Sequence, residues 1–182
     1  MRALFIVAIM VGTALSAPQA GPATFAPVLV SASTSVLRTG LPNHTLTPGA
    51  TNTAVSQATI HSTICVSGYT TRIRPPTSYT TPLKRAQLAT YGYADRSLTH
   101  YEEDHLISLE LGGSPRSPRN LWPEPHSITL ANGTQVGSYA KDGFENFLHR
   151  QICAGRIRLA TAQHEIATNW VSFWIAAGKP RG

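Results

Sequence analysis

The chain has 182 residues, of which 42% are hydrophobic and 13% are charged, a composition that fits a globular protein with one domain of ordinary size. Beyond the amino terminus no apolar stretch is long enough to cross a bilayer, which excludes a protein with several membrane spans. The formal net charge of +6 is unevenly distributed, because all nine acidic residues lie between Asp95 and Glu165 and residues 1–94 hold six lysines and arginines. A basic half of this kind suits a protein that binds phosphate groups, although a basic pI can also serve solubility alone.

The amino terminus has the pattern of a secretory signal peptide. Arg2 precedes an apolar run over residues 3–15, and a cleavage pattern of small residues follows. We predict a signal peptide over residues 1–20, with a membrane anchor as the alternative, and a secreted or periplasmic protein without stable membrane insertion after cleavage. Residues 21–45 are rich in proline, alanine, serine and threonine and predict a flexible linker, so the folded domain is expected over residues 46–180.

Between the linker and the acidic half, the pattern predicts two helices and one strand. A short helix is expected from Asn52 to Cys65, a basic strand from Val66 to Arg74, and a second helix that starts at Thr81-Pro82 and is closed by Gly92. This part holds four cations that we predict to contact phosphate, although each alone could be a solvated surface charge: Arg72, Arg74, Lys84 and Arg85.

The stretch that follows concentrates acid, imidazole, glycine and amide in one short block. We predict a strand from Tyr101 to Leu111, bent at the adjacent Asp104 and His105. A turn at Gly112-Gly113 and a short returning strand at residues 120–122 complete a hairpin. Such a block can hold a divalent metal through oxygen ligands and place an imidazole beside it.

Two helices complete the chain. The first is expected from Ser138 to about Ile152, and its spacing places Asp142, Glu145 and His149 on a single face, where they can meet the hairpin. The second, over residues 159–176, has an apolar side with two tryptophans, which predicts a core position for that side.

The order D-H-L-I-S-L-E-L-G-G-S at residues 104–114, then R-N-L-W-P-E at residues 119–124, resembles the HNH (ββα-metal, His-Me finger) nuclease motif, and more closely a group of small bacterial HNH-like proteins. The resemblance implies an α+β fold in which a ββα-metal hairpin-plus-helix core is surrounded by additional helices. It implies metal-dependent hydrolysis of phosphodiester bonds in nucleic acid, with DNA expected before RNA, and does not indicate the oligomeric state. The chain departs from the motif in its third ligand, because His126 reads as a loop residue.

The resemblance also assigns roles to single residues. His105 would be the general base, and Asp104 would bind one divalent ion, Mg²⁺ before Mn²⁺, Ni²⁺ or Zn²⁺. Asn120 would serve the site either as a metal ligand or by fixing the loop through hydrogen bonds. The helix after Ser138 would add His149 or Glu145 as a further ligand.

Other interpretations of the same residues stay open. Asp104 and His105 can be a salt-bridged pair on an ordinary hairpin, with Asn120 as a turn residue. The protein would then be a non-catalytic secreted module that binds nucleic acid or another polyanion, or a structural protein of the cell envelope. In the nuclease interpretation Arg119 is a further candidate for phosphate contact, and Arg116 competes for that role.

The chain has two cysteines, Cys65 and Cys153. Since the signal peptide directs them to an oxidising compartment, we predict that they form a disulfide. Two cysteines at this separation do not resemble a zinc site, which would need more ligands at shorter spacing.

Overall fold

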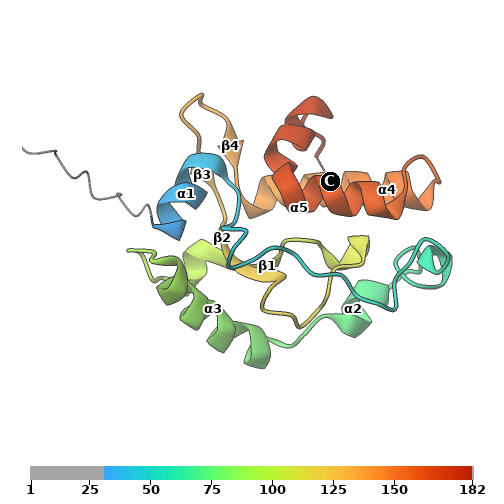
Figure 1. Cartoon of the computed structure of the whole chain (residues 1–182), viewed down its shortest axis with the longest axis horizontal. Coiled ribbons are helices and arrows are strands. Elements are labelled where there is room, and N and C mark those ends of the chain that lie inside the picture. Colours follow the sequence, from blue (N-terminus) through green and yellow to red (C-terminus); the bar gives the residue numbers. More distant parts are fainter. Residues whose placement is uncertain (1–30, 182) are drawn as a thin grey trace, which may run out of the picture.

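The structure, a computed structural model, describes residues 31–181 and shows an α+β protein with helices and two small antiparallel sheets (Figure 1). The α-helices are α1 (Ala32–Thr39), α2 (Tyr69–Ile73), α3 (Thr77–Tyr91), α4 (Ser138–Cys153) and α5 (Leu159–Ala176). One sheet pairs β1 (Tyr101–His105) with β2 (Leu121–Pro125), the other pairs β3 (Ile128–Thr129) with β4 (Gln135–Val136), and short 3₁₀ turns lie at η1 (Ile60–Ser62), η2 (Leu98–His100) and η3 (Leu109–Leu111). The predicted signal peptide, residues 1–20, lies outside the described residues.

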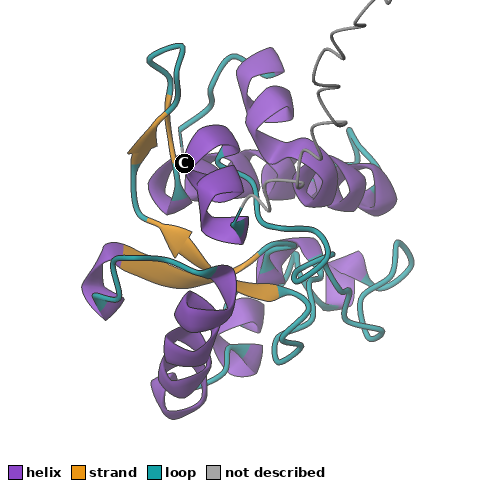
Figure 2. Ribbon diagram, turned by 60° about the vertical axis from the view of Figure 1, so that its left-hand side comes forward, coloured by secondary structure: helices purple, strands orange, loops and turns teal. Residues whose placement is uncertain are grey.

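The β1–β2 hairpin lies between two groups of helices, with α4 and α5 on one side and α3 on the other (Figures 1 and 2). Tyr101 pairs with Pro125 and His105 with Leu121 in an antiparallel register. The returning strand was expected over residues 120–122, but β2 continues to Pro125 and includes Pro123. An edge strand tolerates proline because the backbone groups on its outer side have no partner strand, so a missing N–H there costs no hydrogen bond of the sheet.

Two hydrophobic clusters hold these groups together. The larger fills the space between α4, α5 and the turns before α2, and Trp170 and Ile152 are fully buried in it. The smaller joins α3, α1 and the β1–β2 hairpin around Tyr91, Tyr93 and Trp122. The hairpin therefore separates two cores, and its two faces have different surroundings.

The predictions for the segment before α3 were wrong. The expected helix from Asn52 to Cys65 is a series of turns around η1, and the expected strand from Val66 to Arg74 contains helix α2. The β-branched residues of this segment favour a strand locally, but Tyr69 packs against the larger core and Cys65 is bonded to α4, so tertiary contacts override that preference.

Other elements agree more closely with the sequence. Helix α3 ends at Gly92 as predicted, in the left-handed region at φ 74°, but it begins at Thr77 and carries Pro82 inside it. Helix α5 has the predicted bounds. β1 ends at His105 instead of continuing to Leu111, because the chain turns away at Leu106 into η3.

The disulfide, the amino-terminal linker and the membrane prediction can each be compared with the structure. The disulfide is confirmed, and its Cα atoms lie 5.7 Å apart. The linker expected over residues 21–45 contains helix α1, whose Val36 is buried, so the folded part begins earlier than expected. None of the helices in residues 31–181 is both long and apolar enough to span a membrane.

Candidate functional site

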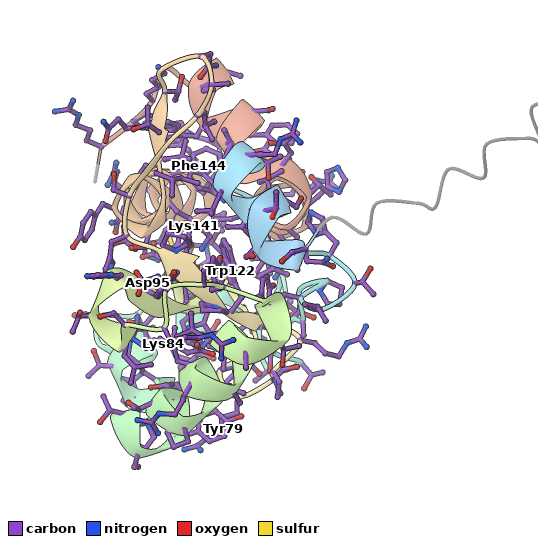
Figure 3. All side chains as sticks on the ribbon, turned by 90° about the vertical axis from the view of Figure 1, so that its left-hand side faces the viewer. Tyr79, Lys84, Asp95, Trp122, Lys141 and Phe144 are labelled. Carbon is purple, nitrogen blue, oxygen red and sulfur yellow. A yellow bond between two sulfur atoms is a disulfide. The ribbon has the colours of Figure 1, made fainter. Side chains whose placement is uncertain are left out.

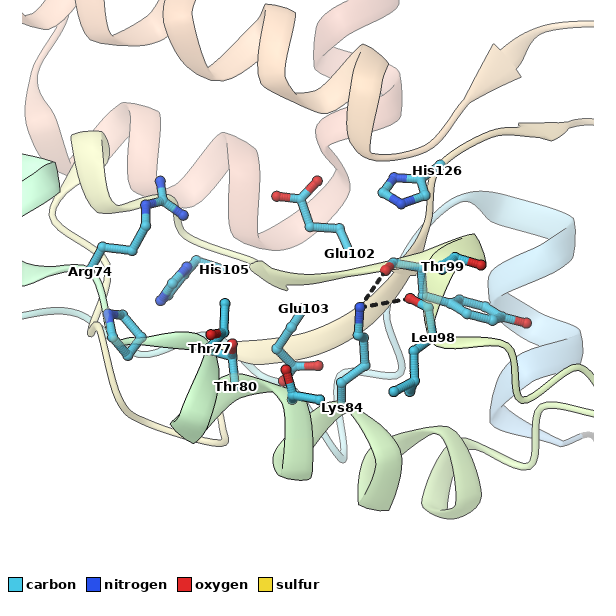
Figure 4. Close-up of a pocket in the computed structure, with 13 residues that line it drawn as sticks. Arg74, Thr77, Thr80, Lys84, Leu98, Thr99, Glu102, Glu103, His105 and His126 are labelled. Carbon is cyan, nitrogen blue, oxygen red and sulfur yellow. Dashed lines mark hydrogen bonds between the residues drawn. The ribbon is translucent and has the colours of Figure 1, made fainter.

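Asp104 and His105 are neighbours on β1, and the strand sends them to opposite sides. Successive side chains of a strand alternate between its faces. Asp104 points towards α4, whereas His105 points towards α3, as do Glu103 and the other groups on the lower side of the strand in Figure 4. The two residues therefore do not converge on one pocket, and each must be considered with the groups it meets.

On the α4 side, the ammonium of Lys141 is enclosed by acceptors. Figure 3 labels this residue between Phe144 and Trp122. Its Nζ donates to Asp104 Oδ2 at 2.6 Å, to Glu145 Oε1, and to the backbone oxygen of His105 at 2.9 Å. Burial disfavours the charge of Lys141, whose side chain is 1% exposed, but the carboxylates of Asp104, Glu145 and Glu124 outweigh burial and raise its pKa. Lys141 is therefore a buried cation with all three ammonium protons engaged.

Glu124 completes this cluster from β2. It is 0% exposed, and its carboxyl oxygens accept no hydrogen bond from any donor within residues 31–181. Burial raises the pKa of Glu124 well above its usual range, and the neighbouring charge of Asp104 raises it further. When protonated, Glu124 can donate to Asp104.

The structure brings only two of the four predicted metal ligands together. Asp104 and Glu145 do come together, but the ammonium of Lys141 lies between them where a metal ion would have to bind. His149 lies elsewhere: its Nε2 is 2.9 Å from the backbone oxygen of Ile64 and its Nδ1 is 3.7 Å from Glu110. As arranged here, the predicted ligands do not fit a divalent ion.

Asn120 has a structural position. It is 0% exposed, its Oδ1 accepts from the backbone N–H groups of Ala50 and Ile107, and its Nδ2 donates to the backbone oxygens of Ile107 and Ser114. The amide is thus fully used in holding the loop between β1 and β2. Of the two roles considered for Asn120, this geometry corresponds to fixing the loop and leaves no lone pair directed at a ligand.

His105 lines a pocket of about 600 Å³ between β1 and α3 (Figure 4). Its Nε2 lies 3.0 Å from the backbone oxygen of Pro115. Because a carbonyl can only accept, this nitrogen carries the proton, and no group of the described chain engages Nδ1 in a hydrogen bond. Burial lowers the pKa of His105, although the Pro115 carbonyl and Asp104 oppose the shift. The imidazole is therefore neutral near pH 7 and has a free lone pair.

Cations and hydroxyls surround this imidazole. Arg74 lies beside His105, and Lys84 reaches the pocket from α3 while donating to the backbone oxygens of Leu98 and Tyr101, each at 2.8 Å. Four threonines also line the cavity, at positions 77, 80, 81 and 99. Such a lining suits an anionic ligand such as a phosphate group.

The pocket also contains two groups that had no predicted role in the site. His126, which the sequence indicated as a loop residue, lines it, with Nδ1 3.0 Å from Ser138 Oγ and its ring stacked on Tyr139. Its place one residue after β2, whose end pairs with the start of β1, was the available signal. Glu103 lies two residues before His105 on the same face; burial raises its pKa to about 8, against the charge of Lys84.

The remaining predicted cations do not line this pocket. Arg72 lies over the ring of Tyr69, Arg116 over the ring of Tyr79, and Arg85 and Arg119 are exposed elsewhere.

Comparisons with protein-family models, with curated proteins and with solved structures return no match for this chain. The chemistry of the site is therefore inferred from its own geometry.

Proposed function

We propose that the chain is an exported hydrolase of phosphodiester bonds in nucleic acid, in which His105 acts as the general base. The observation that carries this proposal is the neutral imidazole of His105, oriented by the Pro115 carbonyl, on the wall of a pocket that Arg74 and Lys84 also line. The HNH resemblance of residues 101–124 points to the same histidine. The Cys65–Cys153 disulfide fits an oxidising compartment, as export predicts.

The reaction needs a base for water and positive charge for the phosphate. Nδ1 of His105 would take the proton of the attacking water, a role that suits an imidazole that is neutral at the working pH. The guanidinium of Arg74 and the ammonium of Lys84 would bind the phosphate oxygens and stabilise the charge that develops on them. The hydroxyls of the pocket threonines can hold the sugar-phosphate backbone.

The ββα core is part of the same proposal. β1, β2 and α4 occur in the order of that motif, with β3 and β4 between β2 and α4, and Lys141 links the helix to β1. We infer that the ammonium of Lys141 has the place of the expected ion between the strand and the helix. No step of the reaction is assigned to Mg²⁺, Mn²⁺, Ni²⁺ or Zn²⁺ at Asp104 and Glu145, since these carboxylates are engaged with Lys141.

The test is cleavage of plasmid DNA, single-stranded DNA and RNA by the purified chain, in EDTA and with each of Mg²⁺, Mn²⁺ and Ca²⁺. We expect His105→Ala to lower the cleavage rate by about 10² to 10⁴ while the Tm stays close to that of the wild type. His105→Asn keeps a polar group next to Pro115 and should be equally inactive. His164→Ala, at an exposed histidine of α5, is the matched control and should retain full activity. Cleavage that survives His105→Ala would remove the assignment of the base.

The second candidate is a non-catalytic module that binds DNA or another polyanion. The exposed Arg72, Arg85 and Arg119 favour it, because they extend the positive surface beyond the pocket. This candidate predicts binding that weakens steeply with salt and no cleavage with any metal. Binding without cleavage by the wild type would select it over the hydrolase.

A further inference from the structure

The disulfide lies next to a histidine and an acid. One ligand atom of each of Cys65, Cys153 and His149 lies within 4.8 Å of the others, and no second group of three such side chains is this close in the described chain. Glu110 is not part of this group of three, but its Oε2 lies 3.7 Å from Nδ1 of His149. Two sulfurs, an imidazole and a carboxylate are thus gathered in one place.

A cavity opens onto this group. It has a volume of about 300 Å³ and is lined by Cys65, Glu110 and His149 together with the chain from Val66 to Thr70. The side chains of Cys65, His149 and Cys153 are half-buried, so a small ion can reach them without disruption of the hydrophobic core. This cavity is separate from the His105 pocket, and the two share no lining residue.

We propose that, when the disulfide is reduced, Cys65, Cys153, His149 and Glu110 form a binding site for Zn²⁺. In the first step a dithiol transfers two electrons and two protons to the sulfurs, the S–S bond breaks, and the dithiol closes its own disulfide. Zn²⁺ then displaces the two thiol protons and forms two Zn–S bonds. The fold therefore carries two alternative links between the segment before α2 and the end of α4, one covalent and one through a metal ion.

The geometry is suitable for a tetrahedral ion. In such a site the ligand atoms lie roughly 3.3–3.8 Å apart, since Zn–S is about 2.3 Å and Zn–N about 2.0 Å. The Cα atoms of the two cysteines are already 5.7 Å apart, so rotation about their side-chain bonds can bring both sulfurs to one ion. The imidazole and Glu110 then supply the third and fourth ligands.

One ring nitrogen of His149 already has a partner that would hold the ring in a zinc site. Nε2 lies 2.9 Å from the backbone oxygen of Ile64, and Nδ1 faces Glu110. Histidine ligands of zinc usually donate their other N–H to a carbonyl or a carboxylate, which fixes the ring. With Nδ1 as the zinc ligand, Nε2 stays bonded to the Ile64 carbonyl, which holds the ring, and Glu110 beside Nδ1 is left to bind the same ion.

The experiment uses the purified chain after reduction with a phosphine. The phosphine takes up the oxygen of a water molecule as the disulfide becomes two thiols. Unlike a dithiol, it does not compete with the chain for Zn²⁺. We expect one equivalent of Zn²⁺ to bind to the reduced chain with a Kd below about 0.1 µM, measured against a chromophoric chelator, and none to the oxidised chain. Co²⁺ should give the near-ultraviolet charge-transfer band of two thiolates and the visible bands of a tetrahedral ion. His149→Ala should weaken zinc binding at least tenfold, whereas His164→Ala should leave it unchanged.

Two results would overturn the proposal: a reduced chain that takes up no Zn²⁺, or binding that His149→Ala leaves intact. If reduction unfolds the chain, the far-ultraviolet circular dichroism becomes the readout. Zn²⁺ should then restore the signal of the reduced wild type but not that of a Cys65→Ser, Cys153→Ser variant. Failure to restore it in the wild type rejects the site. None of these measurements depends on the nuclease activity proposed for His105.

Discussion

The two faces of β1 carry similar residue types but have opposite properties. On the α4 side, Asp104 belongs to a closed cluster in which Lys141 has every proton engaged. On the α3 side, His105 and Glu103 line an open pocket, and the carboxyl oxygens of Glu103 receive no hydrogen bond within residues 31–181. Saturated polar groups contribute to the stability of the fold, whereas unsaturated ones next to a cavity are available to a ligand. Alternation along the strand separates Asp104 from His105, although Glu102, on the face of Asp104, also lines the pocket.

The largest test of this contrast removes the cation of the closed side. Lys141→Met leaves Asp104 and Glu145 buried without their partner, and we expect a loss of about 3–5 kcal/mol in the free energy of unfolding by urea. Arg150→Met, at an exposed position of the same helix, should cost no more than about 0.5 kcal/mol. A Lys141→Met variant as stable as the wild type would show that the cluster does not need the ammonium. Recovery of stability by added Ca²⁺ or Mg²⁺ would instead show that an ion can replace it.

The second test concerns the loop that joins the two strands. Asn120→Ala removes the acceptor of two backbone N–H groups and the donor to two carbonyls, so we expect a loss of about 2–4 kcal/mol by urea denaturation. Asn146→Ala, on the exposed face of α4, is the control and should change little. If Asn120→Ala kept its stability and lost only cleavage, Asn120 would belong to the reacting site and not to the loop.

The outcome for Asn120 illustrates what the sequence could and could not predict. The motif indicated that Asn120 matters, and its place at the start of the returning strand put it close to His105. Whether Asn120 binds a ligand or holds the loop depends on the backbone groups around its side chain, and these come from distant parts of the chain. In the same way, the acid-and-histidine face of α4 was recognised from spacing, whereas Lys141, on the first turn of that helix, was not considered. A lysine is usually exposed, and only the packing of α4 on β1 shows that this one is buried.

Local propensity had a similar limit. Helix α5 and the end of α3 were predicted because capping and hydrophobic periodicity act within the segment. The segment from Val66 to Arg74 was wrongly predicted as a strand. Its helix depends on contacts with residues distant in the sequence, which a local pattern does not contain. Arg74 was named for its charge alone, and it is the fold that places it beside His105 at the pocket.

The third test addresses the open side through pH. The pKa of Glu103 is raised to about 8 in the folded chain, so its protonated form stabilises the fold fully below the unfolded pKa, and this contribution is lost progressively as the pH rises from the unfolded pKa through 8. Glu103→Gln cannot ionise. We expect its stability relative to the wild type to be unchanged at pH 5 and to improve by on the order of 2 kcal/mol at pH 9.

Urea unfolding at five pH values between 5 and 9 measures this difference. Asp95→Asn is the contrasting variant, because Asp95 is exposed and its hydrogen bond with His100 lowers its pKa. It should show no gain at high pH. A constant difference between Glu103→Gln and the wild type across the range would mean that Glu103 does not titrate near 8.

The smallest effect is expected at the rim of the pocket, and it rests on the proposed hydrolase activity. Arg74→Ala removes one cation from the phosphate site, and kcat/KM should fall about tenfold, equivalent to about 1.4 kcal/mol. The charge of Arg74 also lowers the pKa of His105, so its removal should move the acid limb of the pH–rate profile to higher pH, because the imidazole then protonates more readily. Arg85→Ala, an exposed cation of α3 outside the pocket, should change neither quantity. An equal loss in Arg85→Ala would mean that the whole basic surface, and not the pocket beside His105, attracts the substrate.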